Sequence, residues 1–392
     1  MIRVLALVPK APGISPGQRF RLEQWAPHLL ADHGIKLELC PFESPALTDV
    51  LYEPGRRFEK VGWLLRDTWR RRNVLALARA YDAVVIYREV SLLGPAIYEQ
   101  LLAAAGVPLI LDFDDAIWMP SAGGVNGVFS RLRFASKTRT ICNLSRAVVV
   151  GNEYLAAWAR PHSRNVFVVP TSIELASYGP LVPPRDADPF TIVWTGSIAT
   201  LRHLERARPA IEALGRRRAV RLRIICSRPP ERPFAGVENV FVPWTAATES
   251  RDLGPAHVGI MPIPDDAFAR GKCGCKALQY MGVAHPVVVS PVGVNAQIVR
   301  DGENGLHAST DAEWVEALEK LASSPELRER LGRAGRSTVE RGFTSAASAA
   351  LFAKAVYHSV PDHPITHEQR ARERERVADD PAVRPHEGPS WR

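Results

Sequence analysis

Short apolar runs alternate with longer amphipathic stretches along most of the chain. In the first half, the runs have the length of buried strands and are separated by stretches with helical periodicity. We predict strands at 2–8, 35–41, 82–88, 107–111, 147–150 and 166–169, with helices from 18 toward 33 and over 95–105 and 128–143. A strand, a glycine-rich loop and then a helix form the opening unit of an open α/β sheet.

A second α/β unit follows a proline- and glycine-rich connection. Its predicted strands are 190–194, 220–226, 240–242, 258–261 and 287–290, and its predicted helices are 202–214, 275–283, 311–322, 325–340 and 345–358. The predicted organisation is an N-terminal domain at 1–170, a linker at 171–188, a C-terminal domain at 189–344, a last helix at 345–360 and a flexible charged tail at 361–392, with a short helix at 366–377. The strand-end loops of both units would face a shared cleft, where the basic and glycine-containing segments 13–21, 196–202 and 270–276 converge.

Composition indicates a globular protein of a reducing compartment. The chain has 392 residues, 46% of them hydrophobic and 23% charged, as in an ordinary globular protein. Its five cysteines include no C-x-x-C pair, so a disulfide framework or a zinc site is not expected, and a reducing compartment fits. No apolar run reaches the ~20 residues that a spanning helix needs, and Pro9 ends the first run too early for a signal peptide. We therefore predict a cytoplasmic protein.

The formal net charge of +8 is compatible with nucleic acid, an anionic membrane surface or a phosphorylated substrate. One basic segment, 56–72, is amphipathic. It could rest on an anionic membrane surface, which would make the protein peripheral at the inner face of a membrane. We favour the alternative, a helix packed on the sheet with a solvated basic face.

The stretch 269–281 has the composition of an anion site. Gly271 and Gly274 allow the backbone to approach a ligand closely, and the start of a helix adds unpaired amide groups. Arg270, Lys272 and Lys276 add full positive charges, so the stretch suits a phosphate or diphosphate. The alternative is a loop-to-helix junction with solvated basic residues.

Two other strand ends carry candidate chemistry. Arg19 and Arg21 follow the first strand, where open α/β sheets bind ligands. Asp112, Asp114 and Asp115 follow the fourth strand and indicate a divalent metal, acid–base chemistry, or helix capping with a salt bridge.

From about residue 2 to residue 357, the chain resembles the bacterial family-4 glycosyltransferases of the GT-B fold. The resemblance rests on the order and spacing of several motifs: Gly17-Gln18-Arg19-Phe20-Arg21, Tyr87-Arg88-Glu89, 111–118 (LDFDDAIW), 150–155 (VGNEYL), 194–197 (WTGS), and 270–281 continuing into 285–293. It implies two Rossmann-like domains facing each other across a cleft, with the last helix crossing back to the N-terminal domain. The N-terminal domain would bind the acceptor and the C-terminal domain the nucleotide diphosphate.

The resemblance also implies roles for individual residues. Asp114, Asp115 and Lys272 would act at the reacting sugar. The donor would be held by Gly196, Ser197, Arg202, Arg270, Lys272, Gly274, Lys276 and Gln279, and the acceptor side would be shaped by Gly17, Arg19, Arg21, Arg88 and Glu89. The chain departs from the family at two places. Gly271 stands at the first position of the usual Glu-x7-Glu pair and Gln279 at the second, and the usual Arg–Lys phosphate pair falls at Ser197 and Arg202.

The expected activity is retaining transfer of a sugar from a nucleotide-diphosphate sugar to an acceptor hydroxyl, without metal or other cofactor. The acceptor is a small molecule, a glycan or a lipid-linked group, and no nucleic-acid partner is expected. The alternatives are a nucleotide-sugar epimerase or hydrolase on the same fold, and a non-catalytic protein that binds nucleotide sugars.

Overall fold

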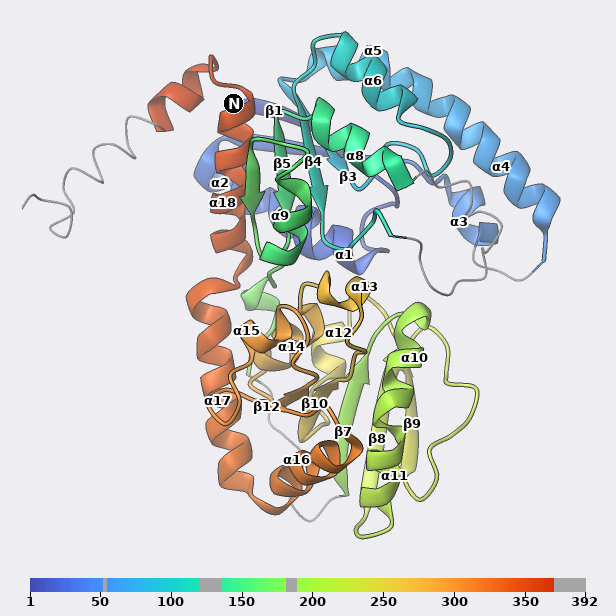
Figure 1. The fold of residues 1–392 in the computed structure, drawn as a ribbon, viewed down its shortest axis with the longest axis vertical. Helices are drawn as coiled ribbons and strands as arrows, with labels where there is room; N and C mark the ends of the chain where they lie inside the picture. The colour runs from blue at the N-terminus through green and yellow to red at the C-terminus, as the bar shows by residue number, and fades with distance from the viewer. Residues whose placement is uncertain (52–54, 120–134, 181–188, 370–392) are drawn as a thin grey trace, which may run out of the picture.

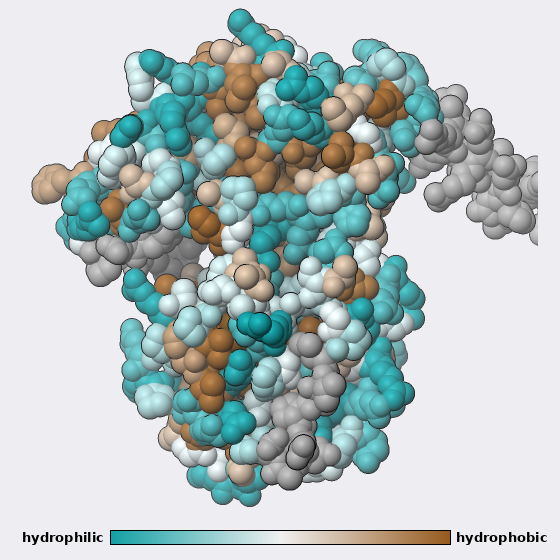
Figure 2. All heavy atoms as spheres, turned by 180° about the vertical axis from the view of Figure 1, so that it is seen from behind, coloured by the Kyte–Doolittle hydropathy of each residue, from teal (hydrophilic) through white to brown (hydrophobic). Residues whose placement is uncertain are grey.

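The computed structural model describes residues 1–51, 55–119, 135–180 and 189–369. They form two α/β domains stacked end to end (Figure 1). Seen from behind, the surface narrows to a waist between two lobes (Figure 2). The predicted two-domain α/β architecture is confirmed.

The N-terminal domain is built on a parallel sheet in the order β2-β1-β3-β4-β5-β6. The strand order reverses beside β1, so the loops after β1 and β3 flank a crevice at the carboxyl edge. Alternate residues of β1 enter two cores: Val4 and Ala6 face the core shared with α2 and α18, whereas Leu5 and Leu7 face the core of α5, α6, α8 and α9. The strands are β1 (Ile2–Val8), β2 (Ile35–Pro41), β3 (Ala83–Tyr87), β4 (Leu109–Phe113), β5 (Ala147–Val150) and β6 (Val166–Val168). The α-helices are α1 (Pro16–Gln18), α2 (Ala26–His33), α3 (Pro45–Leu51), α4 (Arg57–Arg70), α5 (Val74–Leu77), α6 (Ile97–Ala104), α8 (Ala135–Leu144) and α9 (Glu153–Ala159).

The C-terminal domain repeats this plan with the order β12-β11-β10-β7-β8-β9. Its order reverses between β7 and β10, which places the loops after these two strands at the carboxyl edge that faces the N-terminal domain. The strands are β7 (Phe190–Thr195), β8 (Val220–Cys226), β9 (Glu238–Pro243), β10 (Val258–Met261), β11 (Val287–Val289) and β12 (Leu306–His307). The α-helices are α10 (Leu201–Leu204), α11 (Arg208–Gly215), α12 (Glu249–Asp252), α13 (Ala267–Arg270), α14 (Cys275–Gly282), α15 (Asn295–Ile298), α16 (Asp311–Ser323), α17 (Pro325–Gly342) and α18 (Ser345–Ser359).

Three local predictions need correction. The helix predicted from residue 18 is interrupted, because a π-helical turn (Arg19–Glu23) separates α1 from α2. The fourth strand runs two residues further than predicted, so Asp112 lies inside β4. Ordered structure also extends past residue 361: residues 364–369 are helical and Thr366 is buried. Part of the predicted helices 128–143 and 366–377 and of the linker 171–188 lies outside the described residues.

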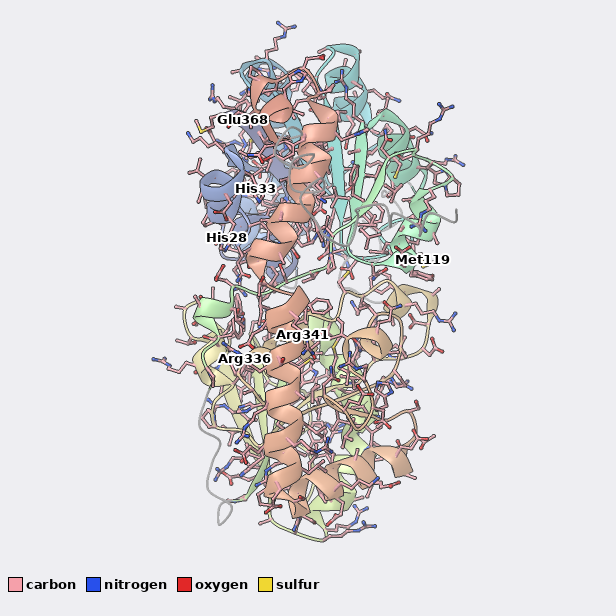
Figure 3. All side chains as sticks on the ribbon, turned by 90° about the vertical axis from the view of Figure 1, so that its left-hand side faces the viewer. His28, His33, Met119, Arg336, Arg341 and Glu368 are labelled. Carbon is pink, nitrogen blue, oxygen red and sulfur yellow. The ribbon has the colours of Figure 1, made fainter. Side chains whose placement is uncertain are left out.

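The last helix crosses from one domain to the other. α17 packs on α14 of the C-terminal domain, and α18 packs on α2 and on the sheet of the N-terminal domain. Figure 3 shows both helices along one side of the molecule, with Arg336 and Arg341 on α17, and His28 and His33 near α18. Ala349, Phe352 and Val356 of α18 complete the same core as Val4 and Ala6. α18 is therefore a structural part of the N-terminal domain.

Gly332 sets the spacing between α17 and the end of α14. A methyl group there would overlap the carbonyl oxygen of Ala284, whereas Gly342 in the same helix faces open space. We expect Gly332→Ala to lower the free energy of unfolding by about 2 kcal/mol because backbone must move. The matched Gly342→Ala should leave it unchanged or raise it by up to about 1 kcal/mol. Urea denaturation measures both, and equal stabilities would show that α17 does not pack in this way.

Candidate active site

The N-terminal side of the site is a cluster of fixed charges at the ends of β3 and β4. Asp114 accepts hydrogen bonds from the Tyr87 hydroxyl at 2.9 Å and from the Arg88 guanidinium at 2.6 and 3.0 Å. Burial opposes ionisation of Asp114, but the charges of Arg88 and Arg21 outweigh burial and lower its pKa. Asp114 is thus held as a carboxylate. Arg88 also reaches Asp115 at 2.9 Å.

Gly17 makes this cluster possible. A Cβ atom there would overlap the Tyr87 hydroxyl and come within 2.5 Å of an Asp114 oxygen. The loop after β1 therefore lies directly against the charged cluster, and only glycine leaves room for it.

Two residues predicted on the acceptor side are paired inside the N-terminal domain. Arg21 is fully buried and donates to Asp112 at 2.6 and 2.9 Å and to the carbonyl of Val169 at 2.8 Å. Its charge is used inside the N-terminal domain, where it links the π-helical turn to β4. Glu89 lies 3.3 Å from Lys137, a buried amine that also donates to the Ser91 carbonyl.

Asn152 joins the two domains. Its side-chain oxygen accepts from the amide of Leu155 and caps α9, while its amide nitrogen donates to the carbonyls of Gly271 at 3.0 Å and Lys272 at 3.2 Å. The Cys273 thiol donates to the Asp114 carbonyl at 3.2 Å. The loop between α13 and α14 is thereby docked on the N-terminal domain.

This docking brings a lysine of one domain to a carboxylate of the other. The Lys272 amine lies 3.5 Å from Asp115. Because Asp115 is also paired with Arg88, one carboxylate bridges cations from both domains. The docking of the two domains therefore brings together all three residues predicted to act at the reacting sugar.

The start of α14 forms the positive side of the site. Gly274 precedes the helix with φ 70°, and no side chain caps this end, so its first amide groups lack intrahelical partners. Lys276, in the first turn, lies with its amine 5.5 Å from the ring of Trp194. Burial, together with the charge of Lys272, lowers the pKa of Lys276 to about 8. No carboxylate in the described part of the chain lies within ion-pair distance of Lys276.

His203 is a site residue that the sequence analysis missed. It is buried on α10 next to Arg202, and its Nδ1 atom has no hydrogen-bond partner among the described residues. Burial and the charges of Lys276, Lys272 and Arg202 lower its pKa to about 4, so the ring is neutral near pH 7. In the sequence, only its position directly after Arg202 indicates that it could belong to the site.

Glu249 is the second residue that was missed, and it organises another contact between the domains. It accepts from Arg19 at 2.5 Å, from the Tyr178 hydroxyl at 2.6 Å and from the Trp244 indole at 3.0 Å. Gln279 donates to Tyr178 at 3.0 Å and is buried. This predicted donor-binding residue is thus part of a hydrogen-bonded network that ends at Arg19.

The remaining predicted donor residues lie at or near the surface. Gly196 follows β7 in a tight turn that leaves no room for a side chain beside Trp194 and Thr200. Ser197 and Arg202 are exposed. Arg270 forms an exposed ion pair with Asp265 at 2.7 Å. Its charge is therefore directed at a neighbour on the surface.

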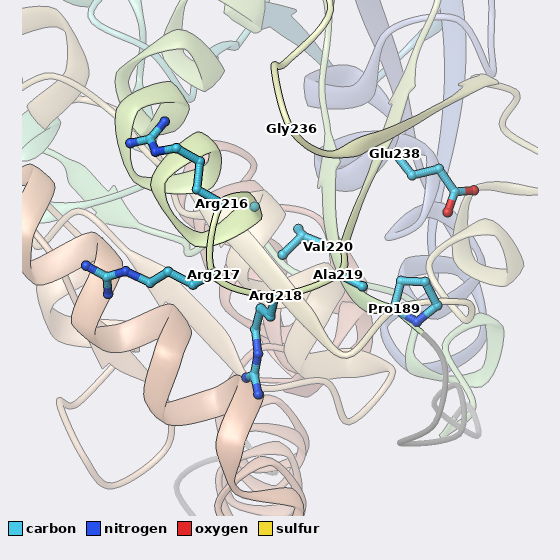
Figure 4. A pocket seen from close by; sticks show the side chains of 9 residues that line it. Pro189, Arg216, Arg217, Arg218, Ala219, Val220, Gly236 and Glu238 are labelled. Carbon is cyan, nitrogen blue, oxygen red and sulfur yellow. The ribbon is translucent and has the colours of Figure 1, made fainter.

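A surface hollow lies at the opposite end of the C-terminal sheet (Figure 4). It is lined by the starts of the strands and by Arg216, Arg217 and Arg218, with Glu238 at its edge. Ligands of open α/β sheets bind at the carboxyl ends of strands, so this hollow does not belong to the site. Among the described residues, no group of three or more His, Cys, Asp or Glu side chains is placed to hold a metal ion.

Comparison with known proteins gives a family match within the C-terminal domain. Residues 189–324 match the family Glycosyl transferases group 1. The chain is similar in structure to sucrose-phosphate synthase from Thermosynechococcus elongatus, with TM-score 0.63 and 13% identity over 97% of this chain and 100% of that chain. No curated protein matches in a sequence search.

Two further structures share the fold. The Anabaena protein HepE, solved in complex with UDP-glucose, has TM-score 0.62 and 12% identity over 91% of this chain and 99% of that one. A glycosyltransferase from Rickettsia africae ESF-5 has TM-score 0.64 and 11% identity over 92% and 99%. The chain has the GT-B fold, as the resemblance implied, and the matched family together with this fold supports a glycosyltransferase.

Gly151 offers a test of how the domains meet. A Cβ atom there would overlap the thiol of Cys273 from the other domain. We expect Gly151→Ala to lower the free energy of unfolding by about 1–3 kcal/mol, and the added Cys273→Ala change to restore part of it by removing the overlapping sulfur. A double-mutant cycle should give a favourable coupling of about 1 kcal/mol or more. Additive effects of the two changes would place these residues apart.

Proposed function

We propose that this chain is a retaining glycosyltransferase that moves a sugar from a nucleotide-diphosphate donor to an acceptor hydroxyl without a metal ion. The observation that carries the proposal is Lys276. It is a lysine without a carboxylate partner among the described residues, in the first turn of α14 and within the region matched by the glycosyltransferase family. A partly desolvated cation beside free helix amides suits a diphosphate.

The same groups would stabilise the leaving diphosphate. Negative charge on the phosphate oxygens increases as the bond to the sugar breaks, and preorganised cations and amides lower that barrier. Lys272 and Lys276 supply the charge that a divalent cation would otherwise provide. His203, neutral and buried beside them, adds an unpaired ring nitrogen to this side of the site.

The carboxylates on the opposite side support retention. An inverting displacement needs a general base on the acceptor hydroxyl. Asp114 is held by Tyr87 and Arg88, and the cations beside it lower its pKa, so it is a weak base. Asp115 is engaged in ion pairs with both Arg88 and Lys272. In a retaining transfer, the acceptor hydroxyl attacks from the same face of the sugar that the diphosphate leaves. An oxygen of the departing phosphate then takes the proton of the acceptor hydroxyl. Asp115 would then position the sugar between the domains.

Transfer is tested with a panel of nucleotide-diphosphate sugars that includes UDP-glucose, using molar glycerol as the probe acceptor and EDTA in every reaction. We expect a glycoside with the anomeric configuration of the donor, identified by NMR. A product of opposite configuration contradicts retention, and activity lost with EDTA but restored by a divalent ion contradicts metal independence. Donor consumption that is equally fast without glycerol indicates a hydrolase or epimerase.

The pKa of Lys276 gives a second test, with UDP as the probe ligand. A bound diphosphate favours the charged amine, so UDP affinity should be greatest below pH 8 and should fall as pH rises through 8, where the free protein loses that charge. Lys276→Met should weaken UDP binding about 10–100-fold and remove this part of the pH dependence. Calorimetry at pH 7.0, 8.0 and 9.0 measures both effects.

The matched control is Lys320→Met, which removes an exposed lysine of the same domain that is paired with Glu316. It should bind UDP like the original chain. If Lys276→Met also binds UDP normally, the diphosphate lies elsewhere.

A further inference from the structure

The inner face of α4 includes charged residues, and its outer face includes large apolar ones. A surface helix normally buries its apolar face and exposes its charged face. The buried positions of α4 include Lys60 and Asp67, together with Leu64. Asp67 accepts from the backbone amide of Ser44 at 2.7 Å, and α4 packs on α3. The exposed arginines of this segment agree with the favoured prediction of a helix with a solvated basic face, but the outer face also carries large apolar side chains that this prediction did not include.

The outer face of α4 is an apolar stripe. Phe58 is 95% exposed, Leu65 59% and Trp69 64%. Positions 58, 62, 65 and 69 follow the helical period, and the remaining one is Gly62. Three large apolar side chains thus lie along one line of the helix. α4 itself lies at the periphery of the N-terminal domain (Figure 1).

Arginines surround this stripe. In the described segment 56–72 the exposed charged residues are Arg56, Arg57, Arg66, Arg70, Arg72 and a single acid, Glu59. The guanidinium of Arg72 lies 3.9 Å from the ring centroid of Trp69, and that of Arg66 lies 4.8 Å from Trp63. The surface therefore combines apolar groups with cations at their edge.

We propose that the outer face of α4 binds the surface of an anionic lipid bilayer. A helix that lies in the interface inserts Trp, Phe and Leu among the acyl chains and keeps its arginines at the headgroups, where anionic lipids attract them. A second copy of the chain is a poor occupant, because pairing two such faces would bring their arginines together. No described helix is long and apolar enough to cross a bilayer, so the contact is peripheral. This inference goes beyond the proposed function, and its test needs no donor.

Co-sedimentation of the full chain with large unilamellar vesicles tests the proposal. We expect binding to phosphatidylcholine vesicles that contain 30% phosphatidylglycerol and little binding to phosphatidylcholine alone. The Phe58→Ser/Leu65→Ser/Trp69→Ser variant should lose at least about tenfold in partition coefficient, because three exposed side chains no longer insert. These residues lie at the surface, so the melting temperature should stay close to that of the original chain.

One further variant tests the contribution of the arginines, and another serves as a control for the apolar side chains. Arg57→Glu/Arg66→Glu should lower binding to anionic vesicles by about tenfold or more through charge alone. Leu30→Ser is the matched control, because Leu30 is an exposed leucine on α2, on the other side of the same domain, and should bind normally. Absent binding, or equal binding by the triple variant, overturns the proposal. Concentration-dependent self-association that the triple variant abolishes, without vesicle binding, assigns the face to a second copy and also overturns it.

Discussion

The approach of Lys272 to Asp115 across the two domains depends on the amide side chain of Asn152. Its oxygen caps α9 in the N-terminal domain, and its nitrogen binds two successive carbonyls in the loop that carries Lys272. Each hydrogen bond alone contributes about 1 kcal/mol. Together they fix the orientation of the loop, and with it the approach of Lys272 to Asp115. The preceding Gly151 permits this contact by leaving space for Cys273.

Much of the fold follows from the sequence because its strands are short, apolar and clearly bounded. The strands predicted at 2–8, 35–41 and 220–226 have the observed bounds. The candidate site was harder to predict, because its pairings are distant in sequence. Arg19 and Glu249 are 230 positions apart, and no local sequence pattern predicts their contact. Arg21 has the same local chemistry as Arg19, yet a π-helical turn directs it into the core.

The departure at Gly271 from the pattern that the resemblance implies has a steric counterpart in the structure. A Cβ atom at this position would lie 3.1 Å from Ala116 and Leu155 of the N-terminal domain. A glutamate side chain would not fit between the domains as they are placed here. The chain therefore has a close backbone contact with the N-terminal domain at the position where the resemblance implies a carboxylate. Lys272, one residue later, lies 3.5 Å from Asp115.

The crossing of α18 also has a consequence for biosynthesis. The core under β1 includes Ala349, Phe352 and Val356, so it stays open until residues near the end of α18 have left the ribosome. Domains synthesised first usually fold first. Here the C-terminal domain, whose core draws on residues up to Leu331 and Val339, can complete its packing earlier. The N-terminal domain, which is synthesised first, therefore completes its core last. Truncation before residue 345 would leave this domain with an exposed apolar surface.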